Sequence, residues 1–462
     1  AAGKPVLATP TENLRQFRDD VFVGDADAIV QRLRDGSWAE VDRVRTAALV
    51  ERHSWPNLLR PVLDRMAQRL PQPSAPATLR ASPPRIDIVN VNFFDWNGET
   101  VYKGGAERYV HDLARLCQRL GCEVRLLQNA NFAFVRRFQG VDVVGVPIAK
   151  EVDFPTLSHG FAEHTREADL VIASPLELAS RFFPTRKVIG INHGVHWDSR
   201  MVRSEAQTTR QFRVIQESLQ RTDVCVCVDT NFVNWVRAFD WRLAQHLQFV
   251  PNYVDTSQFR PLEKDFDAPR LTVLYPRRLY DPRGFHETMD AFDFLAQRTD
   301  ALELHLCGQA TGADADKARR AVAAHEGRIQ WYELPMEEMP RAYDRSHIVL
   351  VPTMYAEGTS LSCVEAMATN NAVIATNVGG LPNLVLDGFS GLLVRPDTWA
   401  IVAALQRLLA DRALAARLAQ NAVGVAESLA KGRWEQRWVE VLDSVVNLPQ
   451  RRSATRRLEV RA

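Results

Sequence analysis

Two glutamates with seven residues between them, Glu357 and Glu365, form the densest group of residues suited to chemistry. Glu357 is followed by Gly358, Thr359 and Ser360, and an apolar stretch, HIVLVPT, ends just before it. Gly358 lets a ligand approach the backbone closely. A helix that starts at the two hydroxyl residues would offer free amides, which bind phosphate. Glu365 could then accept hydrogen bonds from a ribose, and Glu357 from a sugar. The segment therefore predicts a sugar-nucleotide site.

The same segment resembles the family-4 retaining glycosyltransferases of the GT-B fold. Their signature has two glutamates at this spacing followed by AMA, which here is residues 366–368, and the stretch 373–397 is similar as well. The resemblance covers residues 86–445. It implies that the donor is held by Glu357, Gly358, Thr359, Ser360, Leu361 and Glu365.

A second stretch, YPRRLYDPRGF (275–285), resembles the family's Gly-Arg-Leu followed by Lys-Gly. By that resemblance Arg278 holds the diphosphate, and Arg283 takes the position of the usual lysine. Arg277 is a departure, because the family usually has glycine there. Two cations can offset the charge of the leaving group, so no metal or other cofactor is expected. The alternative interpretation is a pair of exposed loop arginines.

The N-terminal half contributes further candidates. Gly104 and Gly105 follow the first strand, open a helix, and resemble the family's Gly-Gly loop, whose amides would face the donor phosphate. His193 resembles the histidine that reaches the transferred sugar, although a buried structural histidine is the alternative. The loop that would meet the acceptor supplies the candidates Asp95, Trp96 and Asn97.

Short apolar stretches alternate with helical patterns in two blocks, which predicts an α/β fold of βαβ units with parallel sheets. Two doubly wound, Rossmann-like domains in tandem would face each other across a cleft at the carboxyl ends of their strands. The predicted parts are a linker at 71–84, an acceptor-side domain at 85–250, a nucleotide-sugar-binding domain at 251–430, a C-terminal helix at 431–448 and a basic tail at 449–462. The hinge segment 250–261 has Tyr253 where the family usually has glycine.

Residues 1–70 predict an αβ fragment that repeats part of the later chain. Residues 1–9 compare with 368–376, and residues 53–64 compare with 432–443 when one gap is allowed. We interpret the fragment as the remnant of an upstream glycosyltransferase C-terminal domain, with chance similarity as the alternative. A tandem arrangement would fit the assembly of bacterial polysaccharide or lipopolysaccharide.

Bulk properties narrow the function classes. The 462 residues carry a net charge of +1, which does not call for a nucleic-acid partner. No apolar run reaches the ~18 residues of a membrane span, and the first residues do not resemble a signal peptide. Six cysteines without a CxxC pair favour small buried side chains in a reducing compartment. Asp314 and Asp316 form an Asp-x-Asp that is better interpreted as helix capping than as a metal site.

The resulting hypothesis is a cytoplasmic, metal-independent, retaining transferase of the hexosyltransferase type. It would move a sugar from a nucleoside diphosphate donor to a glycan or lipid-linked acceptor. A peripheral position at the inner face of the plasma membrane, through the basic tail and anionic lipid, is a second option. A sugar-nucleotide 2-epimerase, a phosphorylase and a non-catalytic sugar-binding module of the same fold remain alternatives. The sequence leaves the base, the sugar and the acceptor open.

Overall fold

The computed structural model describes residues 83–102, 104–150, 152–181, 183, 187–199, 203–446 and 448, and residues 7, 8, 22, 23, 27 and 31. The chain forms two compact units, residues 1–80 and 81–462. In the first unit, β1 (Leu7–Ala8) and β2 (Phe22–Val23) pair in parallel. Most of the predicted fragment and linker, and the basic tail, lie outside the described residues, so the remnant hypothesis stays a prediction.

The N-terminal lobe of the second unit is built on an eight-stranded sheet in the order β10-β9-β8-β7-β3-β4-β6-β5. All neighbours pair in parallel except β5 and β6, which form an antiparallel edge. The strands are β3 (Arg85–Asn90), β4 (Glu123–Asn129), β5 (Phe134–Phe138), β6 (Val141–Val146), β7 (Leu170–Ser174), β8 (Val188–Asn192), β9 (Val224–Cys227) and β10 (Leu247–Phe249).

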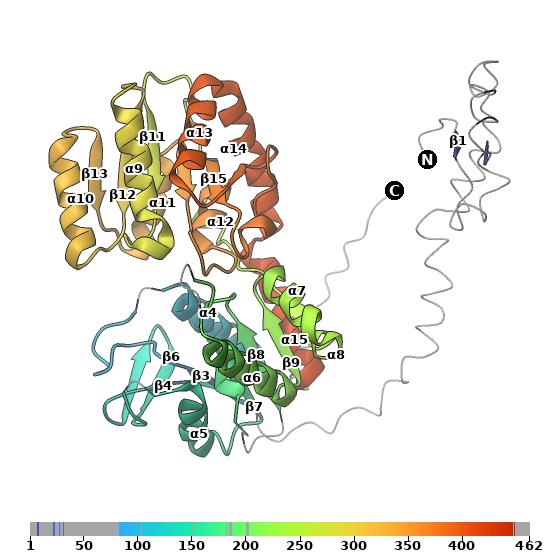
Figure 1. The fold of residues 1–462 in the computed structure, drawn as a ribbon. Helices are drawn as coiled ribbons and strands as arrows, with labels where there is room; N and C mark the ends of the chain where they lie inside the picture. The colour runs from blue at the N-terminus through green and yellow to red at the C-terminus, as the bar shows by residue number, and fades with distance from the viewer. Residues whose placement is uncertain are drawn as a thin grey trace, which may run out of the picture. The chain divides into compact units, whose positions relative to one another are not determined.

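Helices cover both faces of this sheet, because its central strands are apolar on both sides (Figure 1). One face packs against α4 (Gly105–Arg119), and the other packs against the remaining helices of the lobe. Those are α5 (Phe154–His164), the 3-10 helix η3 (Leu176–Ala179), α6 (Glu205–Arg221), α7 (Thr230–Phe239) and the short α8 (Trp241–Ala244).

The C-terminal lobe has a six-stranded, fully parallel sheet in the order β13-β12-β11-β14-β15-β16. Its strands are β11 (Leu271–Tyr275), β12 (Leu302–Cys307), β13 (Ile329–Tyr332), β14 (Ile348–Val351), β15 (Ala372–Thr376) and β16 (Leu392–Val394). Its helices are η4 (Asp281–Arg283), α9 (Phe285–Ala296), α10 (Gly312–Ala324), η5 (Met336–Glu338), α11 (Met339–Asp344), α12 (Leu361–Ala368), η6 (Leu381–Asn383), α13 (Thr398–Ala410) and α14 (Arg412–Glu427).

The last helix, α15 (Lys431–Val445), returns to the N-terminal lobe (Figure 1). Its Trp434 and Trp438 are buried in the core of that lobe, and Trp438 Nε1 donates to Tyr109 Oη of α4 at 2.8 Å. The chain therefore crosses between the lobes twice. Two crossings restrict the relative movement of the lobes more than a single hinge would.

The predicted α/β architecture of two Rossmann-like domains is confirmed. The prediction that the cysteines are small buried side chains is confirmed too: all six are free and buried. None of the helices in the described part of the chain combines the length and apolarity that a membrane crossing needs.

Candidate functional site

The loop between β14 and α12 carries four of the predicted donor residues, which are Glu357, Gly358, Thr359 and Ser360. Ser360 is the N-cap of α12, but its side chain makes no capping bond to the helix. Ser360 Oγ instead contacts Ser362 Oγ at 3.0 Å and Arg277 Nη2 at 3.3 Å. In the described part of the chain no side chain caps α12, so the free first-turn amides of this helix suit an anion.

Glu357 lies at the centre of a cationic cluster. Its Oε2 accepts hydrogen bonds from Arg277 Nη2 at 2.7 Å, Arg283 Nη1 at 3.0 Å and Thr353 Oγ1 at 2.7 Å. Burial by itself raises the pKa of Glu357, but the charges of Arg283 and Arg277 outweigh it and hold the pKa below its ordinary value. Glu357 is therefore a carboxylate at neutral pH, oriented through one of its two oxygens.

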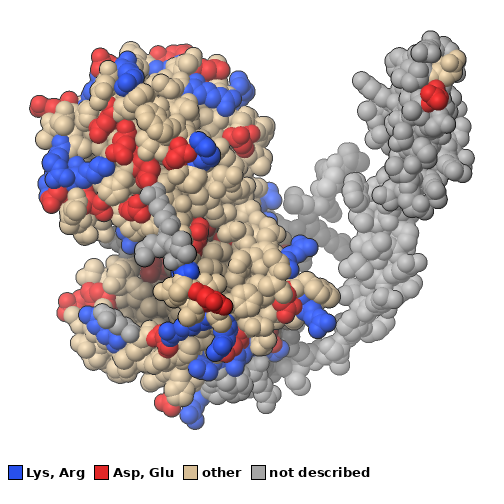
Figure 2. Space-filling view, viewed as in Figure 1, with Lys and Arg blue, Asp and Glu red and all other residues tan. Residues whose placement is uncertain are grey.

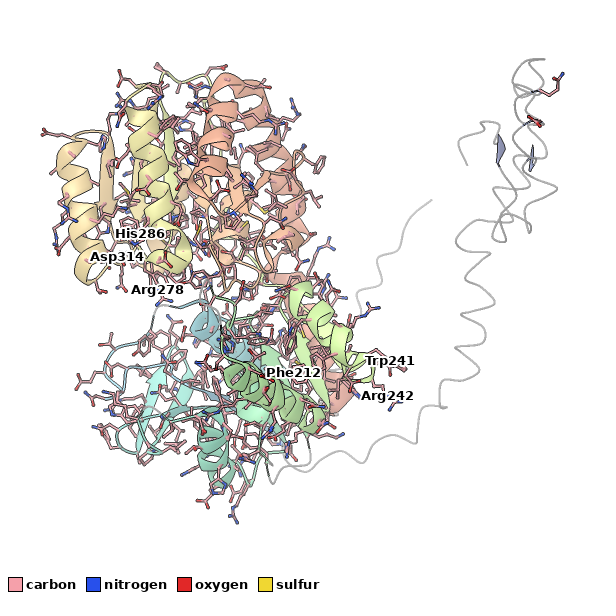
Figure 3. The ribbon with its side chains drawn as sticks, viewed as in Figure 1. Phe212, Trp241, Arg242, Arg278, His286 and Asp314 are labelled. Atoms are coloured by element: carbon pink, nitrogen blue, oxygen red, sulfur yellow. The ribbon has the colours of Figure 1, made fainter. Side chains whose placement is uncertain are left out.

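Arg278, the predicted diphosphate ligand, is exposed and stacks over Tyr280 with 5.5 Å from its guanidinium carbon to the ring centroid. Figure 3 places it at the edge of the C-terminal lobe that faces the N-terminal lobe. Its charge acts on Glu107, in the first turn of α4, although burial has the larger effect and raises the pKa of that glutamate. Arg278 thus lies between the lobes with its guanidinium accessible to an anion.

Glu365, the predicted ribose ligand, is buried with 5% of its side chain exposed. Tyr343 Oη of α11 donates to its Oε2 at 2.8 Å. Its Oε1 forms an ion pair with Arg108 Nη1 of α4 at 2.7 Å. Both carboxylate oxygens are thus engaged, one of them by the opposite lobe.

The Gly-Gly loop and His193 meet this segment from the N-terminal lobe. Gly104 is the N-cap of α4, and a Cβ on Gly105 would lie 3.1 Å from Leu361 Cδ1, so the starts of α4 and α12 face each other. A Cβ on Gly358 would lie 2.5 Å from the backbone oxygen of His193. This close approach requires glycine at 358, because a side chain would push the lobes apart.

His193 follows β8, and its Nε2 lies 2.9 Å from Ser174 Oγ at the end of β7. Its ring meets Tyr109 edge-on with the centroids 5.3 Å apart. Burial, helped by the charge of His196, lowers the pKa of His193 to about 4. The imidazole is therefore neutral at pH 7 and can exchange a hydrogen bond with a ligand without contributing charge.

The acceptor-side candidates lie in a self-supporting loop. Asp95 Oδ1 accepts from the backbone amides of Asn97 and Glu99, and Oδ2 accepts from that of Thr100. Trp96 accepts a backbone bond from Asn131, and the side chains of Asn97 and Asn131 are 3.4 Å apart. Asp95 thus has a structural role in shaping the loop, and contact with an acceptor stays a prediction for all three candidates.

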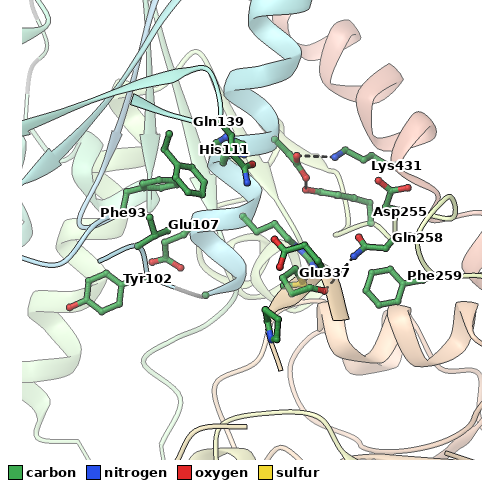
Figure 4. Close-up of a pocket in the computed structure, with 18 residues that line it drawn as sticks. Phe93, Tyr102, Glu107, His111, Gln139, Asp255, Gln258, Phe259, Glu337 and Lys431 are labelled. Atoms are coloured by element: carbon green, nitrogen blue, oxygen red, sulfur yellow. Dashed lines mark hydrogen bonds and ion pairs between the residues drawn. The ribbon is translucent and has the colours of Figure 1, made fainter. Parts of the chain in front are cut away.

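A cavity of about 420 Å³ opens between the lobes beside the hinge (Figure 4). Phe93 and Tyr102 line one side, Gln258 and Phe259 the other. Arg108 also lines it, whereas Glu357 does not. The cavity therefore adjoins the Glu365 end of the site, not the Glu357 end. A broader groove between the lobes is visible in Figure 2.

The interpretation of Asp314 and Asp316 as helix caps is wrong. The N-cap of α10 is Thr311, while Asp314 Oδ1 pairs with His286 Nε2 at 3.1 Å and Asp316 pairs with Arg319. Figure 3 shows the first pair at the same edge of the lobe as Arg278. In the part of the chain that the structure describes, no three His, Cys, Asp or Glu residues are grouped as metal ligands would be.

Sequence reasoning missed the role of Arg277, which was set aside as a departure from glycine. It also missed Arg108, Tyr343 and Ser174. The adjacent pair Arg277-Arg278 could have indicated the role of Arg277, since either arginine could point into the site. The other three residues lie far along the chain from their partners, and a single sequence carries no sign of those contacts.

Two family models match the lobes: residues 103–258 match Glycosyltransferase Family 4, and residues 260–424 match Glycosyl transferases group 1. Together they account for more than two thirds of the chain. The chain belongs to the family-4 type of GT-B glycosyltransferases.

Among curated relatives, the D-inositol 3-phosphate glycosyltransferase of Salinispora arenicola is 37% identical over 204 residues, which is 38% of this chain and 44% of that protein. The protein of the same name from Corynebacterium efficiens is 36% identical over 161 residues, which is 33% of this chain and 37% of that protein. The matched part therefore spans less than half the length of either relative.

Solved structures of this type are similar in fold. Sucrose-phosphate synthase from Thermosynechococcus elongatus has a TM-score of 0.64 at 20% identity, over 78% of this chain and 98% of that one. HepE of Anabaena, solved in complex with UDP, has a TM-score of 0.62 at 17% identity, over 78% of this chain and all of HepE (100%). At these identities the likeness shows the two-lobed fold.

Proposed function

We propose that this family member transfers a sugar from a nucleoside diphosphate donor to an acceptor hydroxyl, with retention at the anomeric carbon. The observation that carries the proposal is the set of groups around the start of α12. Glu357 is held as a carboxylate, and Arg283 and Arg278 lie on the C-terminal side of the gap between the lobes. His193 and the start of α4 approach from the other side.

The parts of the donor can be assigned in turn to the groups of this site. Glu365 accepts the ribose hydroxyls, the diphosphate meets the α12 amides and the arginines, and Glu357 accepts a hydroxyl of the transferred sugar. The cavity beside Arg108 then provides space for the base. HepE was solved in one complex with UDP and in another with UDP-glucose, so these two compounds are the first to test.

In the proposed reaction, the bond between the anomeric carbon and the phosphate oxygen breaks, and the acceptor oxygen bonds to that carbon on the same face. The acceptor proton passes to the leaving phosphate oxygen. The arginines stabilise the charge that grows on the diphosphate, so no metal is required. Neutral His193 is available to accept or donate a hydrogen bond near the reacting carbon.

For the acceptor we propose a glycan or lipid-linked hydroxyl compound, in polysaccharide or lipopolysaccharide assembly in the cytoplasm. The curated relatives are D-inositol 3-phosphate glycosyltransferases, so D-inositol 3-phosphate is the alternative candidate for the acceptor. Assays with both kinds of acceptor distinguish these two possibilities. An epimerase would instead convert the nucleotide sugar without any acceptor.

A thermal-shift screen with UDP, GDP, TDP and ADP tests donor binding, since a ligand that binds the folded state raises the melting temperature. Glu365→Ala should weaken binding of the responding nucleotide. Glu357→Ala should lower turnover more than it lowers nucleotide affinity. The assignment fails if no nucleoside diphosphate binds, or if both variants transfer sugar as fast as the unaltered protein.

A further inference from the structure

Arg277 occupies the position where the family usually has glycine, two residues after the end of β11. Its side chain is buried, with 9% exposed. Nη1 donates to Thr353 Oγ1 at 2.5 Å, and Nη2 donates to Glu357 Oε2 at 2.7 Å. Nη2 also lies 3.3 Å from Ser360 Oγ, the N-cap of α12. Arg277 therefore connects the loop after β14, the carboxylate of Glu357 and the start of α12, the helix proposed to bind phosphate.

These contacts give the two carboxylate oxygens of Glu357 different surroundings. Oε2 accepts bonds from Arg277, Arg283 and Thr353, which is one donor more than the roughly two lone-pair sites of a carboxylate oxygen. Among the described residues, Oε1 accepts no hydrogen bond, and 10% of the Glu357 side chain is exposed. The carboxylate thus presents one oxygen in a fixed direction.

The planar guanidinium of Arg277 is suited to holding the Glu357 carboxylate in one orientation. Its two terminal nitrogens point in fixed directions, so the bonds to Thr353 and Glu357 set the position of the carboxylate relative to β14. Arg283 donates one hydrogen bond to Glu357, and the same nitrogen, Nη1, also donates to the carbonyl oxygen of Ala356. Arg283 by itself therefore holds Glu357 less firmly than the two arginines do together. With glycine at 277, Glu357 would lose its shortest cationic contact and one of its three restraints.

We propose that Arg277 is a positioning residue for the donor sugar: it holds Glu357 Oε2 so that Oε1 accepts a hydroxyl of the transferred sugar in the orientation that transfer requires. This inference rests on the proposed function. It separates two tasks within the site. Glu365, Arg278 and the α12 amides bind the nucleoside diphosphate, and Arg277 acts on the sugar through Glu357.

The test compares Arg277→Gly, which restores the family's usual residue, with Arg277→Lys in the full chain. Calorimetry measures the Kd for UDP, or for whichever nucleoside diphosphate binds the unaltered protein. Release of that nucleotide from its sugar conjugate, with and without acceptor, gives kcat and KM. For Arg277→Gly we expect a Kd within about threefold of the unaltered protein and a kcat lower by about 100-fold, because small misplacements of a site group cost this much. Arg277→Lys should recover part of kcat.

Arg328→Ala is the matched control. Arg328 belongs to the same lobe, has 15% of its side chain exposed, and donates to the backbone oxygens of Ala296, Thr299 and Leu302. Its loss should lower the melting temperature and leave kcat and KM unchanged. This variant shows what destabilisation of the lobe does without any change at Glu357.

Two outcomes would overturn the inference. In one, Arg277→Gly keeps its kcat, so that Arg277 does not position Glu357 for transfer. In the other, Arg277→Gly loses nucleotide binding and melting temperature together with kcat, and lysine restores none of them, so that the role is structural. If the unaltered protein binds no nucleoside diphosphate, the proposed function itself fails, and the inference fails with it.

Discussion

Arg108 of α4 and Glu365 of α12 form an ion pair between the two lobes, with Nη1 and Oε1 2.7 Å apart. Side-chain exposure is 19% for Arg108 and 5% for Glu365, so water screens the pair weakly. The carboxylate proposed to bind ribose therefore also contacts the opposite lobe. In the proposed function, donor binding and lobe contact share one group.

Arg108→Ala should lower the free energy of unfolding by roughly 2 kcal/mol, between the values for exposed pairs and for fully buried pairs. The reason is that Glu365 keeps a buried charge with Tyr343 as its remaining partner. Urea denaturation measures the change. The control is Arg119→Ala on the same helix, whose pair with Glu435 is more exposed and should contribute less than about 1 kcal/mol. Equal effects of the two variants would contradict the prediction.

Stability should fall as the pH falls from about 6.5 towards 4, in part because of His193. The folded protein holds the pKa of His193 at about 4, whereas an unfolded histidine titrates near ~6.5. Between these values the unfolded chain binds a proton that the folded chain does not, which favours unfolding. His193→Gln removes this contribution and leaves an amide that can reach Ser174. Its unfolding free energy should drop less between pH 7 and pH 4.5, as followed by urea denaturation. An identical drop in both proteins would show that His193 does not titrate this way.

Tyr253, which replaces the family's usual glycine in the hinge, should be important for stability. Tyr253 is 2% exposed, and the centroid of its ring lies 4.4 Å from that of Trp434. Its hydroxyl donates to Asp112, which also forms an ion pair with Lys431. Tyr253→Gly should cost about 3–5 kcal/mol, as removal of a buried aromatic side chain does. Tyr253→Phe keeps the ring and should cost about 1–2 kcal/mol. If glycine were tolerated without loss, the ring would not hold α15 against the hinge.

Gly358→Ala should reduce activity by separating the lobes. A Cβ there would lie 2.5 Å from the backbone oxygen of His193 and 2.8 Å from Val228 Cγ2, and a backbone atom cannot swing aside. We expect a stability loss of about 1–3 kcal/mol and a lower kcat in the sugar-release assay. Gly424→Ala in α14 is the matched control, because no atom lies within 4 Å of its Cβ position. That change should stabilise the protein by about 0.5–1 kcal/mol and leave kcat unchanged. Similar behaviour of both variants would refute the steric explanation.

Local patterns in the sequence determined the elements and the type of fold. The alternation of apolar and helical stretches predicted two parallel sheets, because strands buried on both faces must be apolar throughout. The spacing of Glu357 and Glu365 placed one acid before a helix and the other inside it, which the structure reproduces with α12 at Leu361–Ala368. Both inferences depend on residues close together in the chain, so periodicity and spacing suffice for them.

The tertiary structure decided which side chains meet. Arg277 and Arg278 are neighbours in sequence, yet Arg277 contacts Glu357 and Arg278 is exposed, because the chain bends at Arg277 after β11 and the two side chains leave it in different directions. The partners of Glu365 come from α4 and α11, and the core of the N-terminal lobe is completed by α15 from the far end of the chain. Such contacts depend on how two lobes pack together, and packing between distant segments leaves no periodic signal in a single sequence.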